Sequence, residues 1–201
     1  MTPVGQTRLP AAERRQAIVD AALRVFVDRS YAGTTTAEIA RHAGVSEPIL
    51  YRHFRSKRDL FFACLDEAWR QLREAWEVKM AQLGASDAVS AIGKTALGLR
   101  KERVLLPNLW VQALSEAGSD PVIRKHLRDQ MREVHDFVAG TIRSAQAAGG
   151  VASDRDPDAE AWIFVAGGLL ISVADRLGGV LGHDDFTAIA AQRYRWLTGS
   201  G

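Results

Sequence analysis

Glu47, Pro48 and Ile49 follow Ser46 at a point where the sequence predicts the start of a short helix. Ser46 is a favourable N-cap, and Pro48 is tolerated in the first turn because the N–H groups there lack helical partners. A carboxylate in this place can accept a hydrogen bond from cytosine N4, and an aliphatic side chain can contact a thymine methyl group. The alternative for Glu47 is that its negative charge stabilises the helix N-terminus. The two roles are compatible.

Another short helix is predicted immediately before this one. Its apolar residues recur at i, i+1 and i+4 and form a narrow stripe: Ile39, Ala40 and Ala43. Thr35 or Thr36 suits its N-cap. Gly44 ends it, because the residue after a helix often needs a positive φ, which glycine adopts freely.

Leu50 and Phe54, spaced i and i+4, give the second helix an inner face. Two helices of one or two turns, joined by a short turn that contains glycine, form a helix-turn-helix unit. The second helix of such a unit lies in the DNA major groove, with its N-terminal residues at the base edges. Residues 34–57 therefore predict a DNA-binding element around which the chain is organised.

The run TTTAEIARHAGVSEPILYRHFRSKRDLF, residues 34–61, resembles the DNA-binding signature of the TetR (tetracycline-repressor-like) family of bacterial transcriptional regulators. The order AGVS, LYRHF and SK at this spacing carries the resemblance. It extends back through an amphipathic first helix and covers about Ala11 to Leu65. The remainder of the chain resembles the family in length and helical character only.

The resemblance implies that Tyr51, His53 and Lys57 contact phosphate oxygens. Ala37 stands where some members of the family have a long basic side chain that reads a base, so base readout must rest on the recognition helix. The predicted DNA-contacting residues are Thr35, Thr36, Glu47, Pro48, Ile49, Tyr51, His53 and Lys57.

Charge and composition agree with a soluble DNA-binding protein. Residues 1–60 hold ten Lys and Arg against six Asp and Glu, whereas residues 61–201 hold sixteen against eighteen. A basic end on a nearly neutral body suits a module that contacts phosphates. The N-terminus lacks the apolar segment of a signal peptide, and the longest apolar run, 161–174, is shorter than the ~20 residues that span a bilayer. We expect a cytoplasmic protein with no membrane partner.

The spacing of apolar residues predicts an all-α fold of about nine helices. A first helix runs from Pro10 to about Arg29, and a long fourth helix continues to about Leu83. Further helices are predicted near 87–99, 107–118, 121–148, 157–177 and 184–197. We expect a DNA-binding domain at 1–56 and an effector-binding and dimerisation domain at 57–201, with the boundary within the fourth helix because no linker is present.

The segment WIFVAGGLLISVA, residues 162–174, is apolar on all sides and must be covered nearly everywhere. Packing against a two-fold copy of itself would cover it; the alternative is a central helix within one chain. The resemblance implies dimerisation through the last two helices in a four-helix bundle. The predicted interface residues are Trp162, Val165, Gly168, Leu169, Ser172, Ile189 and Arg193.

Aromatic and sulfur-containing side chains of the second domain are candidates for a ligand cavity, since such cavities are mostly apolar. They are Trp69, Trp76, Trp110, Met131 and Phe164, and the alternative for each is an ordinary core position. The single cysteine, Cys64, and the spacing of the five histidines give no pattern for a metal site. No cofactor is expected.

Two functions are compatible with these features. The first is a homodimeric regulator, a repressor that a small hydrophobic or amphipathic effector releases from its double-stranded DNA operator. The second is an all-helical carrier or enzyme without DNA binding. The sequence contains no nucleophile elbow, no phosphate-binding glycine loop and no paired His/Glu helix motif, so we expect no catalysis.

Overall fold

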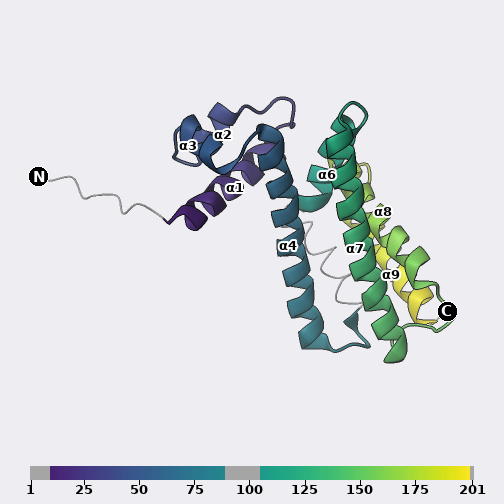
Figure 1. Cartoon of the computed structure of the whole chain (residues 1–201). Helices are drawn as coiled ribbons and strands as arrows, with labels where there is room; N and C mark the ends of the chain where they lie inside the picture. Colours follow the sequence, from purple (N-terminus) through teal and green to yellow (C-terminus); the bar gives the residue numbers. More distant parts are fainter. Residues whose placement is uncertain (1–9, 89–104, 200–201) are drawn as a thin grey trace, which may run out of the picture. The chain divides into compact units, whose positions relative to one another are not determined.

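The structure is a computed structural model that describes residues 10–88 and 105–199 (Figure 1). These residues form eight helices and no strand, which confirms the all-α prediction. The helices are α1 (Ala11–Asp28), α2 (Thr36–His42), α3 (Glu47–His53), α4 (Lys57–Leu83), α6 (Leu105–Ala117), α7 (Pro121–Ala147), α8 (Pro157–Arg176) and α9 (His183–Thr198). The helix predicted near 87–99 falls almost entirely outside the described residues.

By its internal contacts the chain divides into two compact units, residues 1–67 and 68–201. The division falls inside α4, a continuous helix of 27 residues. We describe each unit separately.

In the first unit, α1 supplies one side of a small core through Ile18, Ala22 and Phe26, which are fully buried. The Phe26 ring packs edge-on against Phe61 of α4 at 5.1 Å between ring centroids. Helix α2 packs against both α1 and α3, so the two short helices are supported by the longer ones. This core holds the helix-turn-helix unit in place.

Local signals set the ends of α2. Thr35 is its N-cap: the Thr35 hydroxyl accepts a hydrogen bond from the Glu38 N–H, and the Glu38 carboxylate accepts one from the Thr35 N–H. This reciprocal arrangement is a capping box. The Thr35 N–H, helped by the positive charge of Arg29, lowers the pKa of Glu38. At the other end Gly44 has φ +66°, the left-handed conformation expected there.

In the second unit, α7 packs against both α6 and α8 (Figure 1). Helices α7 and α8 begin with the same Asp-Pro pair. Asp120 accepts from the N–H groups of Val122 and Ile123, and Asp156 accepts from those of Asp158 and Ala159. The predicted stripe of α7 is buried at Leu127, Val134, Val138, Ile142 and Ala145, whereas Met131 is half-buried.

The segment after α7 approaches another part of the second unit closely. A Cβ atom added to Gly150 would overlap the backbone of Ser86, including its carbonyl oxygen. The absence of a side chain at this position therefore allows the segments that follow α4 and α7 to meet.

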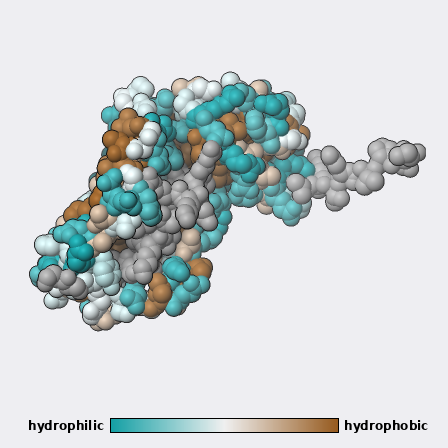
Figure 2. Space-filling model, turned by 180° about the vertical axis from the view of Figure 1, so that it is seen from behind, coloured by the Kyte–Doolittle hydropathy of each residue, from teal (hydrophilic) through white to brown (hydrophobic). Residues whose placement is uncertain are grey.

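Helix α8 buries one side only. Ala161, Val165, Ser172 and Ala174 are buried in the core of the chain. A row of large apolar side chains on the rest of the helix and at its C-cap is more than 40% exposed: Trp162, Ile163, Leu170, Val173 and Leu177. We call these five residues the α8 stripe. The Trp162 ring also stacks on His135 of α7, with 4.4 Å between the ring centroids. Apolar surface is also visible among hydrophilic surface in the view from behind (Figure 2).

By length and composition α8 could cross a membrane, although only 28% of its apolar window is buried. The sequence predicted an apolar run, 161–174, too short to span a bilayer; the helix has 20 residues because 157–160 and 175–176, which include four charged residues, are also helical. A core helix of a water-soluble protein passes the same test.

Candidate nucleic-acid interface

Helix α3 presents two different faces. Leu50 and the following Phe54 point into the core of the first unit and are 0% and 3% exposed. Pro48 and Arg52 are exposed, and Ile49 is half-buried. Because Pro48 and Arg52 are four residues apart, they share one face of the helix.

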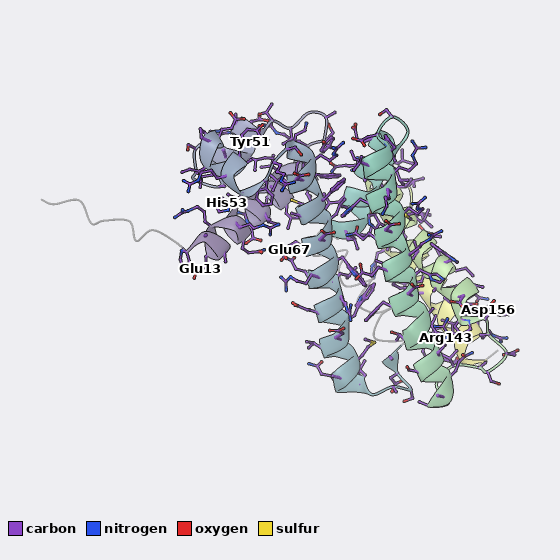
Figure 3. The ribbon with its side chains drawn as sticks, in the orientation of Figure 1. Glu13, Tyr51, His53, Glu67, Arg143 and Asp156 are labelled. Atoms are coloured by element: carbon purple, nitrogen blue, oxygen red, sulfur yellow. The ribbon has the colours of Figure 1, made fainter. Side chains whose placement is uncertain are left out.

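Glu47 and Tyr51 are tied to α2 through a single hydroxyl group. The Thr36 Oγ1 atom lies 2.5 Å from Glu47 Oε1 and 3.0 Å from the Tyr51 phenol oxygen. Thr36 is buried, while the Tyr51 side chain is 47% exposed. Figure 3 labels Tyr51 and His53 on α3. Three of the predicted contact residues therefore form one hydrogen-bonded cluster.

Lys57 joins the start of α4 to the loop between α1 and α2. Its ammonium group donates to the carbonyl oxygens of Tyr31 and Thr34, at 2.9 Å and 3.1 Å. The same nitrogen lies 4.4 Å from the centre of the Tyr31 ring. An ammonium group has three N–H donors, so one remains for a further acceptor.

The eight predicted DNA-contacting residues thus lie on α2 and its N-cap, on α3, and at the first position of α4. Their hydroxyl and ammonium groups are more engaged within the protein than the sequence indicated. Thr35 closes the capping box, Thr36 is buried, and Lys57 binds two carbonyl oxygens. Pro48, Ile49 and His53 make no side-chain hydrogen bond within the described part of the chain.

Arg52 was not among the predicted contact residues. It is exposed one turn after Pro48, and no ion pair or hydrogen bond joins it to another described residue. A basic side chain four residues after Pro48 on a recognition helix is a signal that the sequence already contained. A guanidinium in this position can contact phosphates or the O6 and N7 atoms of guanine.

In the second unit, most of the predicted ligand-cavity residues pack against one another. Trp76 contacts the rings of Trp69, Phe137 and Phe164, with centroid distances of 5.4–5.9 Å. Trp110 donates from its indole nitrogen to Gln130 at 2.8 Å, and both side chains are buried. The described residues contain no group of three His, Cys, Asp or Glu side chains arranged to hold a metal ion.

The predicted dimer-interface residues divide between two faces. Trp162 and Ile189 are exposed, and Leu169 is half-buried. Val165 and Ser172 instead face the core of their own chain, and a Cβ on Gly168 would touch Pro107. These three positions therefore do not belong to the exposed face of α8.

The seventh predicted interface residue, Arg193 of α9, forms an ion pair with the buried carboxylate of Glu160 on α8. Burial lowers the pKa of the Arg193 guanidinium. Glu160 also accepts from the Trp196 indole nitrogen at 2.9 Å. Arg193 therefore joins α9 to α8 within one chain.

Comparison with known proteins places both parts of the chain. Residues 18–64 match the family model of bacterial regulatory proteins of the tetR family, and residues 85–167 match that of the BetI-type transcriptional repressor C-terminal domain. The first match contains all eight predicted DNA-contacting residues.

Individual relatives agree with this assignment. The transcriptional activator FasR of Mycolicibacterium smegmatis is 53% identical over 58 residues, which are 29% of this chain and 26% of FasR. The transcriptional regulator BetI of Rhizobium meliloti is 33% identical over 115 residues, 57% of each protein. The chain thus matches less than two thirds of the length of these relatives.

A solved structure of a transcriptional regulator from Saccharomonospora viridis, in complex with choline, is 26% identical. It aligns over 90% of this chain and 95% of that one, with a TM-score of 0.68. The helix-turn-helix geometry, the two family models and these relatives lead to one conclusion: the chain belongs to the TetR family of DNA-binding transcriptional regulators and has a BetI-type C-terminal domain.

Proposed function

We propose that the protein is a ligand-responsive homodimeric repressor, released from its operator by a small hydrophobic or amphipathic molecule. The α8 stripe carries the dimer in this proposal, and the similar regulator in complex with choline supports the effector. The TetR family consists of regulators and not enzymes, so the all-helical carrier or enzyme is not supported. A bacterial regulator that binds DNA acts in the cytoplasm, which is where we place it.

The α8 stripe supports a dimer because water-soluble monomers rarely expose such a contiguous apolar surface. Its side chains recur along one face of the helix, and Ile189 and Trp196 of α9 are also exposed. Gly167 lies within this face, and a Cβ added there would meet no other atom within 4 Å. A second copy of the chain, related by a two-fold axis, would cover both helices with the same surface of its own.

A dimer of this kind presents two α3 helices to DNA. Dimeric helix-turn-helix proteins bind two half-sites about 34 Å apart, in successive major grooves. We expect the operator to be a palindrome with that spacing. Selection of bound fragments from genomic DNA with the purified protein tests this. A set of enriched fragments without paired half-sites would contradict it.

Ile49→Ala should lower affinity for the operator and leave non-specific affinity nearly unchanged. Ile49 lies at the start of α3, where an aliphatic side chain can contact a thymine methyl group, and loss of such a contact costs about 1–3 kcal/mol. Titration of operator and scrambled duplexes at several salt concentrations measures both affinities. Arg52→Ala is the comparison variant: a lost phosphate contact should weaken both duplexes alike and reduce the salt dependence, whereas a lost guanine contact should weaken the operator alone. Equal weakening of both duplexes by Ile49→Ala would disprove the base contact.

Choline is the first effector to test, since the Saccharomonospora viridis regulator binds it. Its quaternary ammonium group is attracted to aromatic ring faces, and the second unit is rich in tryptophan and phenylalanine. A saturating effector should weaken operator binding by about 5- to 150-fold, because it binds the two states of the dimer with different affinity. Fluorescence anisotropy of labelled operator measures the change.

Longer amphipathic molecules, such as fatty acids, form the second arm of the same titration. A Trp76→Leu variant should bind operator normally and respond less to the active compound. If no compound of either class changes operator affinity, the protein regulates transcription without an effector of the proposed kind.

A further inference from the structure

We propose that Glu47 is a positioning residue that acts through Thr36 on Tyr51, and not a residue that reads a base. The proposal rests on the proposed placement of α3 in the major groove. Its evidence is the cluster of three side chains in which Thr36 Oγ1 lies 2.5 Å from Glu47 Oε1 and 3.0 Å from the Tyr51 phenol oxygen.

The number of hydrogens determines the direction of both bonds. An ionised carboxylate only accepts hydrogen bonds, whereas a threonine hydroxyl has one hydrogen to donate. Thr36 must therefore donate to Glu47. Its hydrogen is then used, so Tyr51 must donate its own phenol hydrogen to Thr36. The three residues form a one-way chain from Tyr51 to Thr36 to Glu47, with the carboxylate as the final acceptor.

This chain has two consequences for DNA binding. It fastens both turns of α3 to the first turn of α2, because Glu47 and Tyr51 are four residues apart on α3 and Thr36 is the first residue of α2. It also fixes the orientation of the Tyr51 hydroxyl group, because the phenol hydrogen is donated to Thr36. The Tyr51 side chain is nevertheless 47% exposed. Phosphate oxygens only accept, so Tyr51 must give up its bond to Thr36 before it can donate to a phosphate.

Thr36 makes the proposal testable without disturbing a group that faces DNA, because its side chain is buried with an exposed fraction of 8%. Thr36→Val removes the hydroxyl and nearly preserves the shape. If Glu47 acts through Thr36, then Thr36→Val and Glu47→Ala should change operator affinity by the same factor. The double variant should show that same factor and not the product of the two, since both changes break the same chain.

Glu47→Gln separates positioning from base reading. Its amide oxygen can still accept from Thr36, so a positioning role predicts the same preferred operator as the native protein. A base-reading role predicts a changed preference at one base pair, because glutamine pairs with adenine whereas glutamate accepts from cytosine. Selection of bound fragments with native and Glu47→Gln protein shows directly which base each protein prefers. A shift of one base pair from cytosine to adenine overturns the proposal.

Thermal denaturation of the full chain without DNA gives a readout that does not depend on the proposed function. Thr36→Val and Glu47→Ala should each lower Tm by about 2–4 °C, and the double variant should show the same shift and not the sum. Additive shifts would overturn the positioning role. If the native protein failed to bind DNA while the shifts remained non-additive, the proposed DNA function would fail and the cluster would stand.

Discussion

Leu170→Glu is expected to convert the protein into a monomer and to lower operator affinity by about 100-fold or more. Leu170 lies in the middle of the α8 stripe and is 43% exposed, so a charge there leaves the fold of one chain intact. In the proposed dimer it would place two buried carboxylates close together, which is strongly unfavourable. Loss of the dimer removes the gain from binding two half-sites at once, a factor of about 10²–10⁴.

Analytical ultracentrifugation at micromolar concentration measures the first effect, and operator titration measures the second. Val78→Glu is the matched control, since Val78 is an apolar residue of α4 that is 59% exposed and lies outside the stripe. It should sediment and bind as the native protein does. A Leu170→Glu protein that remained a dimer with normal affinity would show that α8 is not the interface.

Lys57→Met should lower both the stability of the DNA-binding unit and its affinity for all duplexes. The methionine keeps an apolar stem of similar length but removes the donor to the Tyr31 and Thr34 carbonyl oxygens. Hydrogen bonds from charged groups each contribute about 1.5–3 kcal/mol. Because the site is only part-buried, we expect a total loss of about 2 kcal/mol, or a Tm lower by about 4–8 °C.

Arg55→Met is the control for the charge, because Arg55 is exposed and removing it leaves that loop untouched. Its Tm should not change. Calorimetry of the free protein together with titration of operator and scrambled DNA measures both properties. A Lys57→Met protein with the native Tm but weaker DNA binding would show that Lys57 contributes to phosphate binding and not to stability.

Local signals in the sequence predicted much of the fold. The Asp-Pro pairs marked the starts of α7 and α8, and the i, i+4 spacing of Leu50 and Phe54 marked the inner face of α3. Such signals act over a few residues, so the order of the sequence is enough to find them. They could not decide between Thr35 and Thr36 as N-cap, because either hydroxyl is suitable; the reciprocal bonds with Glu38 identify Thr35.

The exposed face of α8 could not be predicted in the same way. Because the helix is apolar on all sides, its hydrophobic pattern does not indicate which side faces the chain's own core. The predicted interface therefore mixed exposed Trp162 with buried Val165 and Ser172. Only the packing of α8 in the fold distinguishes them.

Contacts between residues distant in sequence could not be predicted either. Lys57 binds carbonyl oxygens 23 and 26 residues away, and Glu47 meets a hydroxyl 11 residues away. Both residues were assigned to DNA on their type and place in the motif. Nothing local indicates that their polar groups already have partners within the protein.

Gly150 provides a way to sort related sequences by their geometry. Since any side chain at this position would overlap the backbone of Ser86, every residue other than glycine forces the segments after α4 and α7 apart. In a homologue with alanine or a larger residue here, the segment after α4 and the segment after α7 must therefore follow different paths. When the second unit is used as a template for other chains, this single position indicates where the template stops being transferable.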